Sequence, residues 1–562
     1  KPGPSNHTVT NANASRTARL PLVGVVRACR VAWVVFALAL AAPPAAAQHP
    51  LVSIPLDDPV YPVFAALDAA GCRHARVSAY RPWLVRDVRK AADAALRDSA
   101  CAKPAMSAAL REVHGRFTRD TFDLFSSGGD VRVGGSVVLR ATGLSGGEFG
   151  LPWRGIRPTS EGDLPFAAVA RGRIAWTGER VAAVTEAVGY TSRRNDPSVR
   201  QRALRNTSGA VDFGESYVNF AIADALVFSL GRSDEAWLGT GRESIVLSAH
   251  GPSLDRILLT GRWRRIEGRA LLATLSQVEL TPLLDTLPGT EARRFFRYLV
   301  GHALTIRPSR TVELTIGETA VLARGTRTIE LAYANPLMPF VITQNDTSRF
   351  GGDANDNLQI FGGAILRSGG SRLDIEALVD DIQIDAKDRK TVQDQLAWRV
   401  KGTQALPWLA LGSAAAEYRH VNSFTYLRAP YATAFQNYDQ PLGSELGPDA
   451  DMIRGSIEAW PRTSVRGALS AGLWRQGAQR LDARPGATVN GTGSLPYPSV
   501  SLLRPFVQRA LVGGLEVGYY TTALQIASQI EVANVRHPAN RPEPTASYVR
   551  TQVTGRYAFR IP

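Results

Sequence analysis

The final stretch of the sequence, Tyr548 to Ile561, alternates between two kinds of side chain. One set is apolar, aromatic or small: Val549, Thr551, Val553, Gly555, Tyr557, Phe559 and Ile561. The intervening set is polar: Arg550, Gln552, Thr554, Arg556 and Arg560. Because successive side chains of a strand point to opposite faces, this pattern predicts a β-strand with one apolar face and one polar face. An aromatic-rich strand of this kind at the end of an exported chain is typical of the strand that closes a bacterial outer-membrane barrel.

The N-terminal region has the features of a secretory signal peptide. Four arginines between residues 16 and 30 precede the apolar run 31–42, and the small residues Ala45 and Ala47 suit a peptidase site. The run is shorter than the roughly 20 apolar residues of a spanning helix, so cleavage is favoured over the alternative, an uncleaved anchor. We therefore expect residues 1–47 to be removed on export.

Short alternating runs continue from about Asp130 to the C-terminus, separated by clusters of Gly, Pro, Asn and Asp. The clearest are Val312, Leu314 and Ile316; Leu373, Ile375, Ala377 and Val379; Val465, Gly467, Leu469, Ala471 and Leu473; and Leu524, Ile526, Ile530 and Val532. Aromatic residues near run ends suit the interface girdles of a barrel: Trp263, Trp398, Trp408, Trp460 and Tyr519. At about 22 to 26 residues per strand and turn, residues 129–562 predict a closed antiparallel transmembrane barrel of about 18 strands.

A soluble array of β-sandwiches would show the same alternation. Such an array leaves the terminal strand and the single long domain unexplained. With 44% apolar and 20% charged residues, the composition is compatible with either architecture. We therefore expect an all-β barrel located in the bacterial outer membrane.

Residues 48–128 lack strand alternation and are rich in Ala, Arg and Leu. Helical spacing and proline positions predict three short helices, over Pro59–Ala70, over Pro82–Ser99 and from Pro104 onward. The prediction is a small periplasmic helical domain ahead of the barrel, with long barrel loops that partly fill the lumen.

Cys72 and Cys101 are the only cysteines outside the predicted signal peptide. An oxidising periplasm allows them to pair, and such a bridge would add about 3 kcal/mol through loop entropy. The alternative is two small unpaired core residues, because a sequence does not give the distance between their Cα atoms.

The chain carries a formal net charge of +15, and nearly all of the excess is arginine. The planar guanidinium of arginine binds carboxylate or phosphate in bidentate geometry, which the ammonium of lysine does not. The sequence therefore indicates acidic polysaccharide and lipopolysaccharide phosphates as partners. The arginines alternate with apolar residues and do not gather into a basic patch, which argues against nucleic acid.

Three sequence segments indicate a protein family as well as a fold class. Residues 231–248 read GRSDEAWLGTGRESIVLS, residues 356–385 contain DNLQIFGG followed by LDIEALVDDIQID, and residues 437–451 read NYDQPLGSELGPDAD. From about Leu56 to the end, the chain resembles the Wzi family of outer-membrane capsule assembly proteins. One departure is Leu238, which stands between Trp237 and Gly239 where the family pattern has Trp followed directly by Gly.

The resemblance implies a monomeric outer-membrane barrel of 18 strands with a small periplasmic helical bundle. It also implies a role in attaching capsular polysaccharide to the cell surface. It assigns no glycan-binding residue individually.

Two long segments without alternation, residues 335–357 and 428–451, combine aromatic rings with amide and carboxylate side chains. Proteins bind sugars by stacking aromatic rings on their C–H faces and by hydrogen bonds from amide or carboxylate groups to neighbouring hydroxyls. We therefore expect the following glycan-binding residues: Phe340, Gln344, Asn345, Asp346, Tyr431, Gln436, Tyr438, Asp439, Gln440, Glu445 and Asp449. The alternative is that Gly, Asn, Asp and Pro only make turns here and that the loops fold inward.

His420, Asn422 and Ser423 are the best local candidates for a catalytic set. Period two places His420 and Asn422 on one face and Ser423 on the other, so the three cannot converge without a bulge. No HExxH or paired-cysteine pattern for a metal is present in the sequence. We therefore expect no enzymatic activity, no cofactor and no metal site.

The functional prediction is a non-enzymatic, lectin-like protein that binds or anchors capsular or other surface polysaccharide. The alternative is a general or substrate-selective diffusion porin, which needs an open lumen. A third possibility is a scaffold that binds periplasmic envelope proteins through the helical domain. The expected partners are surface polysaccharide, outer-membrane lipid and lipopolysaccharide, with the chain as a monomer.

Overall fold

The computed structural model describes residues 50–72, 74–118, 130–145, 166–191, 209–239, 242–280, 293–344, 356–381, 394–409, 411–427, 431–438, 440–477, 481, 506–521 and 523–561. Residues 44–562 form one compact unit. The predicted signal peptide lies outside the described residues.

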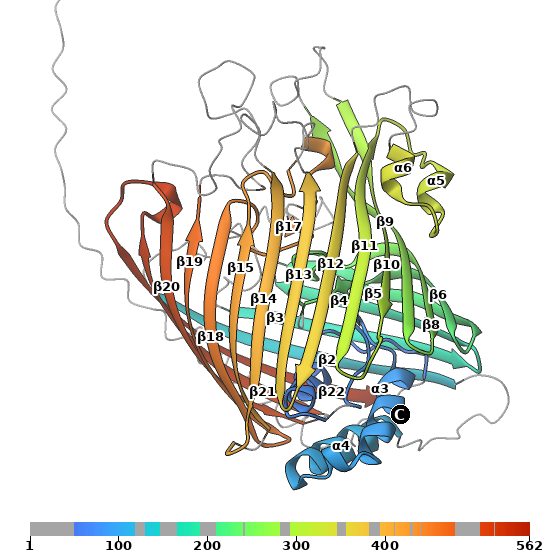
Figure 1. The fold of residues 1–562 in the computed structure, drawn as a ribbon, viewed down its shortest axis with the longest axis vertical. Coiled ribbons are helices and arrows are strands. Elements are labelled where there is room, and N and C mark those ends of the chain that lie inside the picture. The colour runs from blue at the N-terminus through green and yellow to red at the C-terminus, as the bar shows by residue number, and fades with distance from the viewer. Residues whose placement is uncertain are drawn as a thin grey trace, which may run out of the picture. The chain divides into compact units, whose positions relative to one another are not determined.

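Within the described residues, eighteen strands form a closed antiparallel barrel (Figure 1). They are β2 (Asp130–Ser145), β3 (Phe166–Gly178), β4 (Val181–Thr191), β5 (Gly209–Ala223), β6 (Leu226–Ser233), β8 (Leu254–Trp263), β9 (Ile266–Leu280), β10 (Arg293–Ile306), β11 (Val312–Arg324), β12 (Asn357–Ser368), β13 (Ser371–Asp381), β14 (Gln395–Leu406), β15 (Gly412–Val421), β18 (Ala450–Arg462), β19 (Val465–Gln476), β20 (Gln508–Tyr520), β21 (Leu524–Arg536) and β22 (Ala546–Ile561). The last strand, β22, pairs with the first, β2, from Val133↔Ile561 to Ser145↔Val549. The prediction of a closed barrel of about 18 strands, sealed by the terminal strand, is confirmed.

Apolar side chains cover the outside of this wall. The predicted alternating runs supply many of them, and the exposed members include Leu314, Ile316, Ile375, Leu469, Leu473, Ile526, Ile530 and Val532. On β22, Val549 and Val553 are exposed whereas Arg550 is buried. An apolar exterior on a closed barrel is a lipid-facing surface, so the predicted orientation of these strands is confirmed.

The predicted aromatic positions divide into two groups. Trp263, Trp398, Trp408 and Tyr519 are exposed, as girdle residues should be. Trp460 is only 1% exposed; it packs against Tyr520 and its indole nitrogen donates to Glu458. Its prediction as a girdle residue was wrong, because position 460 shares the inward face of β18 with Glu458.

The two ends of the barrel differ in their connections. At one end, β3–β4, β8–β9 and β12–β13 are joined by the two-residue turns 179–180, 264–265 and 369–370. Gly369 and Gly370 both have positive φ, which glycine adopts without strain. The other end carries long connections, such as residues 477–507. We refer to these as the short-turn end and the long-loop end.

Three helices precede the barrel, as predicted: α2 (Val60–Ala69), α3 (Val85–Leu96) and α4 (Pro104–Thr118). A disulfide joins Cys72 to Cys101, the latter in the 3₁₀ turn η1 (Ser99–Cys101). No helix among the described residues is long and apolar enough to cross a bilayer.

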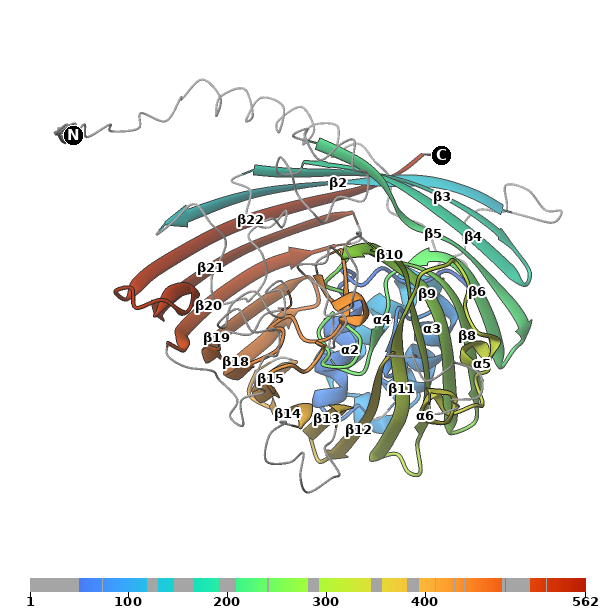
Figure 2. The same cartoon turned by 90° about the horizontal axis from the view of Figure 1, so that it is seen from above.

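The helix α2 lies inside the ring of strands at the short-turn end (Figure 2). Its Asp68 carboxylate accepts a hydrogen bond from Arg367 at 2.9 Å and pairs with Arg372, and these arginines flank the β12–β13 turn. A second link joins Asp87 of α3 to Arg262 of β8 at 2.8 Å. The helical segment is therefore fixed to the barrel by ion pairs.

An arginine on the lipid-facing side of β21 should be costly. Ile530→Arg is expected to lower the free energy of unfolding in lipid vesicles by about 2–4 kcal/mol, because a charge near the middle of the membrane loses its hydration. The adjacent control, Gln529→Arg, faces the lumen and should cost less than about 1 kcal/mol. Urea unfolding followed by tryptophan fluorescence measures both variants, and equal losses would contradict the assignment of the two faces.

Candidate functional site

The connection between β6 and β8, residues 234–253, enters the lumen from the long-loop end. It contains the two-residue strand β7 (Ala236–Trp237), and Trp237 is fully buried. The indole packs against Phe361 of β12, with ring centroids 6.1 Å apart. It also lies over Gly301 of β10, where a Cβ would come within 3.0 Å of the ring. The wall therefore has space shaped for this side chain.

The segment ahead of α3 reaches the same place from the short-turn end. Its two-residue strand β1 (Tyr80–Arg81) pairs antiparallel with β7, with Tyr80 opposite Trp237 and Arg81 opposite Ala236. We call this pairing the β1–β7 joint. It links two parts of the chain that enter the barrel from opposite ends.

Side chains lock the β1–β7 joint in place. The Tyr80 and Trp237 rings meet edge to face, 5.8 Å apart, and Thr305 of β10 donates to the Tyr80 hydroxyl at 2.8 Å. The Arg81 guanidinium donates to the carbonyl of Leu238 at 3.0 Å. Leu238, which separates Trp237 from Gly239, has φ 61°, a left-handed conformation that is uncommon for leucine.

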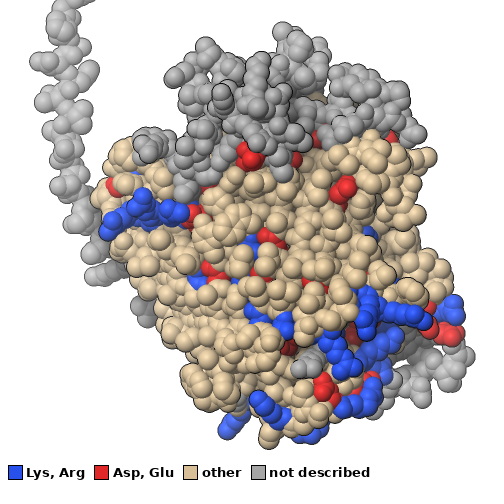
Figure 3. All heavy atoms as spheres, viewed as in Figure 1, with Lys and Arg blue, Asp and Glu red and all other residues tan. Residues whose placement is uncertain are grey.

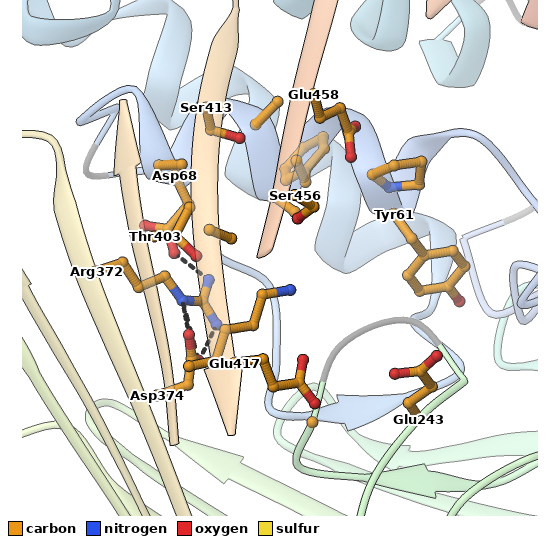
Figure 4. Close-up of a pocket in the computed structure, with 18 of the residues that line it drawn as sticks. Tyr61, Asp68, Glu243, Arg372, Asp374, Thr403, Ser413, Glu417, Ser456 and Glu458 are labelled. Carbon is orange, nitrogen blue, oxygen red and sulfur yellow. Dashed lines mark hydrogen bonds and ion pairs between the residues drawn. The ribbon is translucent and has the colours of Figure 1, made fainter. Parts of the chain in front are cut away.

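A cavity of about 560 Å³ lies in the lumen beside this joint. Its lining includes Tyr61 and Asp68 of α2, and Leu238 and Glu243 of the inward connection. Figure 4 shows Arg372 between Asp68 and Asp374, with Glu417, Glu243 and Glu458 around the same space. The volume is within the roughly 300–1,000 Å³ typical of ligand pockets.

One wall of the cavity carries a chain of ion pairs. Arg399 of β14 bonds Glu376 of β13 and, at 2.8 Å, Glu417 of β15. Arg419 of β15 then joins Glu417 at 2.7 Å to Glu243 of the inward connection at 2.9 Å. Both guanidiniums are fully buried. The network thus ties residues 234–253 to three strands of the wall.

The pKa of Glu243 follows from this arrangement. Burial is the largest effect and opposes ionisation of its carboxyl, but the neighbouring positive charges, Arg419 first among them, together hold the pKa below its ordinary value of 4.5. Glu417 acts against ionisation, whereas His250 and Arg454 favour it. Glu243 is therefore a carboxylate at neutral pH.

The charges around the cavity balance. The described lining residues include eight Arg or Lys and eight Asp or Glu. Lys401, for example, stands directly opposite Asp374 on one neighbouring strand and Glu417 on the other. Hydroxyls of Thr403, Ser413 and Ser456 also line the space. Mixed donors and acceptors without net charge suit a neutral polyhydroxyl ligand better than an ion.

The second predicted glycan segment folds against the inward connection. It contains η6 (Tyr431–Thr433), β16 (Gln436–Asn437) and β17 (Gln440–Pro441). Ser248 donates to the carbonyl of Gly443 at 2.6 Å, and the nearby Tyr426 hydroxyl donates to the carbonyl of Ile245 at 2.6 Å. The segment therefore packs onto residues 245–248.

The predicted glycan residues of this segment have different surroundings. Gln436 and Gln440 belong to one small hairpin and are buried, and Asp449 is fully buried and accepts from Ser423. Tyr438 and Glu445 remain partly exposed, and Glu445 lies 3.9 Å from His250. Asp439 and the Tyr431 side chain lie outside the described residues.

The first predicted segment takes a different place. Its described part contains the end of a helical stretch formed by α5 (Leu331–Ala334) and α6 (Phe340–Gln344), which lie beside the outer wall (Figure 1). Phe340 is 1% exposed and packs on His302, whose ring centroid is 4.4 Å away. The Gln344 side chain, Asn345 and Asp346 lie outside the described residues.

The prediction of residues 335–357 as a loop is corrected by α6, which lies within this segment, whereas α5 directly precedes it. Phe340 and Tyr333 cover Val300, Ala320 and Leu322 of the outer wall. The structure therefore does not bring Phe340 together with the partly exposed Tyr438 and Glu445. The signal for helix was weak, because each helix is only four or five residues long.

The candidate catalytic trio does not converge. His420 and Asn422 share a hydrogen bond of 2.7 Å, whereas Ser423 donates to Asp449 instead. The prediction from strand period is confirmed. Within the described ranges, no group of three or more His, Cys, Asp or Glu side chains is arranged to hold a metal ion.

Comparison with known proteins gives the fold. No protein-family model and no curated protein sequence matches the chain. The structure is similar to that of Wzi from Escherichia coli, an outer membrane protein involved in group 1 capsule assembly and described as a carbohydrate-binding β-barrel. The TM-score is 0.57 at 11% identity, covering 91% of this chain and 99% of that one.

Two Pseudomonas aeruginosa proteins also match. OccD3 (OpdP) gives a TM-score of 0.43 at 9% identity, covering 77% of this chain and 92% of its own. OpdK, solved with vanillate, gives 0.42 at 9% identity, covering 76% and 99%. The structural similarity to Wzi thus confirms the barrel architecture that was expected from the sequence.

The Arg399 network should be critical to stability. Arg399→Met leaves Glu376 and Glu417 without their shared guanidinium, and the expected loss is about 3–5 kcal/mol in the free energy of unfolding. The control Arg454→Met removes an exposed lumen arginine that bonds Ser470 and should cost less than about 1 kcal/mol. Urea unfolding in vesicles compares the two, and equal small losses would show that the network is not needed.

The Glu243–Arg419 pair should respond to acid. Because the folded pKa of Glu243 lies below its unfolded value, the pair contributes stability above about pH 4.5 and loses it as the pH falls through the folded pKa. The free energy difference between the wild-type protein and Glu243→Gln should be constant above about pH 5 and shrink below it. Urea unfolding from pH 3 to 7 measures this difference. An increase in the free energy difference as the pH falls would contradict the assignment.

Proposed function

We propose that this chain is a monomeric outer-membrane barrel that binds capsular or other surface polysaccharide and holds it at the cell surface without catalysis. The observation that carries the proposal is the β1–β7 joint inside the lumen. Two segments enter from opposite ends and meet at this joint. Ion pairs fix both to the wall, Glu243 with Arg419 in one segment and Asp68 with Arg367 in the other. A barrel built in this way is suited to binding rather than to free diffusion.

The similarity to Wzi supports the choice of ligand. That protein shares the barrel fold over 99% of its length and is described as carbohydrate binding. The cavity beside the β1–β7 joint is a separate space, because its described lining contains none of the predicted glycan residues.

The asymmetry of the barrel sets the proposed orientation. Long connections of such barrels face the cell exterior, and short turns face the periplasm. The long-loop end would then meet the polysaccharide, and the helical segment, residues 48–128, would face the periplasm after removal of residues 1–47. This arrangement also leaves the helices available to other envelope proteins.

Tyr438 and Glu445 are the proposed glycan contacts among the described residues. They are the partly exposed members of the predicted set, and both belong to the connection between β15 and β18 at the long-loop end. A tyrosine ring can stack on the C–H face of a sugar, and a carboxylate can bond paired hydroxyls. The outer-wall residue Phe340 offers a control, because its ring is buried away from this connection.

Glycan binding by detergent-purified protein tests the proposal. Surface polysaccharide from the source cells should bind the wild-type protein, and Tyr438→Ala should weaken binding about tenfold, the equivalent of about 1.4 kcal/mol. Phe340→Ala should lower the free energy of unfolding by about 3 kcal/mol but leave binding unchanged.

Retention of polysaccharide by cells provides the matching test in vivo. A strain lacking the protein should make polysaccharide and shed it into the medium. Unchanged retention, together with no binding by the purified wild-type protein, would contradict the proposed function.

A further inference from the structure

Three arginines stand side by side on the outside of the barrel at the long-loop end. Arg475 of β19 is directly opposite Arg509 of β20, and Arg509 is directly opposite Arg536 of β21. Each occupies the same face of its strand as an exposed apolar residue, respectively Leu473, Leu511 and Val532. The three guanidiniums therefore project outward as one row. Figure 3 shows basic side chains gathered on this side of the barrel, below the loops.

The row carries more positive charge than its surroundings neutralise. Arg475 is paired with Asp451 of β18, which accepts from its Nε at 2.8 Å. Within the described residues, the guanidiniums of Arg509 and Arg536 make neither an ion pair nor a hydrogen bond, although both side chains are exposed. Like charges directly opposite each other across strands are destabilising, so the bare row is an unfavourable arrangement that an anion would relieve.

The height of the row on the barrel wall identifies the layer that it faces. Along β20 the outward residues after Arg509 are apolar or glycine down to Tyr519: Leu511, Gly513, Leu515 and Val517. Ten residues at about 3.3 Å, tilted by about 40°, span about 25 Å of membrane thickness. That span equals the apolar band of an outer-membrane barrel, with Tyr519 at the inner girdle. The arginines therefore lie at the outer edge of the hydrocarbon.

We propose that Arg475, Arg509 and Arg536 form a binding site for the phosphate groups of lipopolysaccharide in the outer leaflet. Guanidinium groups match phosphate oxygens in bidentate geometry. The exposed Leu473 and Leu511, two residues further along their strands, and Val532, which follows the exposed Asn534 on β21, would contact acyl chains of the same lipid. A soluble acidic polysaccharide would satisfy the arginines but not these apolar side chains, which is why the lipid is favoured. The site is independent of the proposed glycan function, because a barrel that held no polysaccharide would keep it.

Titration of the full-length barrel with bis-phosphorylated lipid A in detergent, followed by native mass spectrometry, tests the proposal. Arg509→Gln/Arg536→Gln should bind about 30-fold more weakly than the wild-type protein, since each basic residue near a membrane surface contributes about 1 kcal/mol and about 1.4 kcal/mol is tenfold. Arg509→Lys/Arg536→Lys should recover most of the loss. The control Arg310→Gln/Arg462→Gln removes two exposed arginines at the short-turn end and should bind like the wild-type protein.

Competition experiments separate the possible sources of the anion. Dephosphorylated lipid A should bind weakly and equally to the wild-type protein and the Gln variant. Inorganic phosphate and polygalacturonate should not displace the phosphorylated lipid at equal concentration of anionic groups. Equal lipid binding by the wild-type protein and the Gln variant, or displacement by polygalacturonate, would overturn the proposal. Unchanged migration of unboiled samples on gels would show that the variants keep the closed barrel.

Discussion

The β1–β7 joint is the interaction on which the interior of this barrel depends. Two strands of two residues each have little stability of their own. Here they are held by the Tyr80–Trp237 ring contact, by the Thr305 hydroxyl and by the space that Gly301 leaves for the indole. The joint fixes the segment from the short-turn end and the connection from the long-loop end at once. The cavity of about 560 Å³ lies beside the joint and is lined by both segments and by the wall.

The charges of the lumen serve the same arrangement. A barrel wall presents one face to lipid and the other to its interior, so every second residue is free to be polar. In this chain, inward arginines and carboxylates on β13, β14 and β15 are close enough to pair, and Glu243 joins the inward connection to them. Removing one partner of a buried pair leaves an uncompensated charge, so the pairs hold the connection even though their net contribution to stability is modest.

The sequence predicted the fold more fully than the site. Alternation along β11, β13, β19, β21 and β22 is a local signal, and it predicted both the closed barrel and its lipid-facing side. The Asp130 boundary of the first strand and the three helices also followed from local patterns. Trp460 was wrongly predicted to be a girdle residue, because its position in β18 has the same parity as the inward Glu458.

Features that depend on register were not predicted from the sequence. Glu376, Arg399 and Glu417 meet because three strands align at one level, and Arg475, Arg509 and Arg536 form a row for the same reason. The role of Trp237 inside the barrel was not predicted, because its partners Tyr80 and Phe361 are remote in sequence. Phe340 was predicted to bind glycan, but its ring is buried on the outer wall. The helical turn that places it there is too short to give a clear periodicity.

Single-channel recording in planar bilayers tests the central claim most directly. If the β1–β7 joint obstructs the lumen, the wild-type protein should give no stable conductance steps, because the two joined segments block the path of ions. A variant in which a short Gly-Ser linker replaces residues 236–250 should give conductance steps, because it lacks β7 and the ion pair between Glu243 and Arg419. Large, stable steps from the wild-type protein would contradict the account.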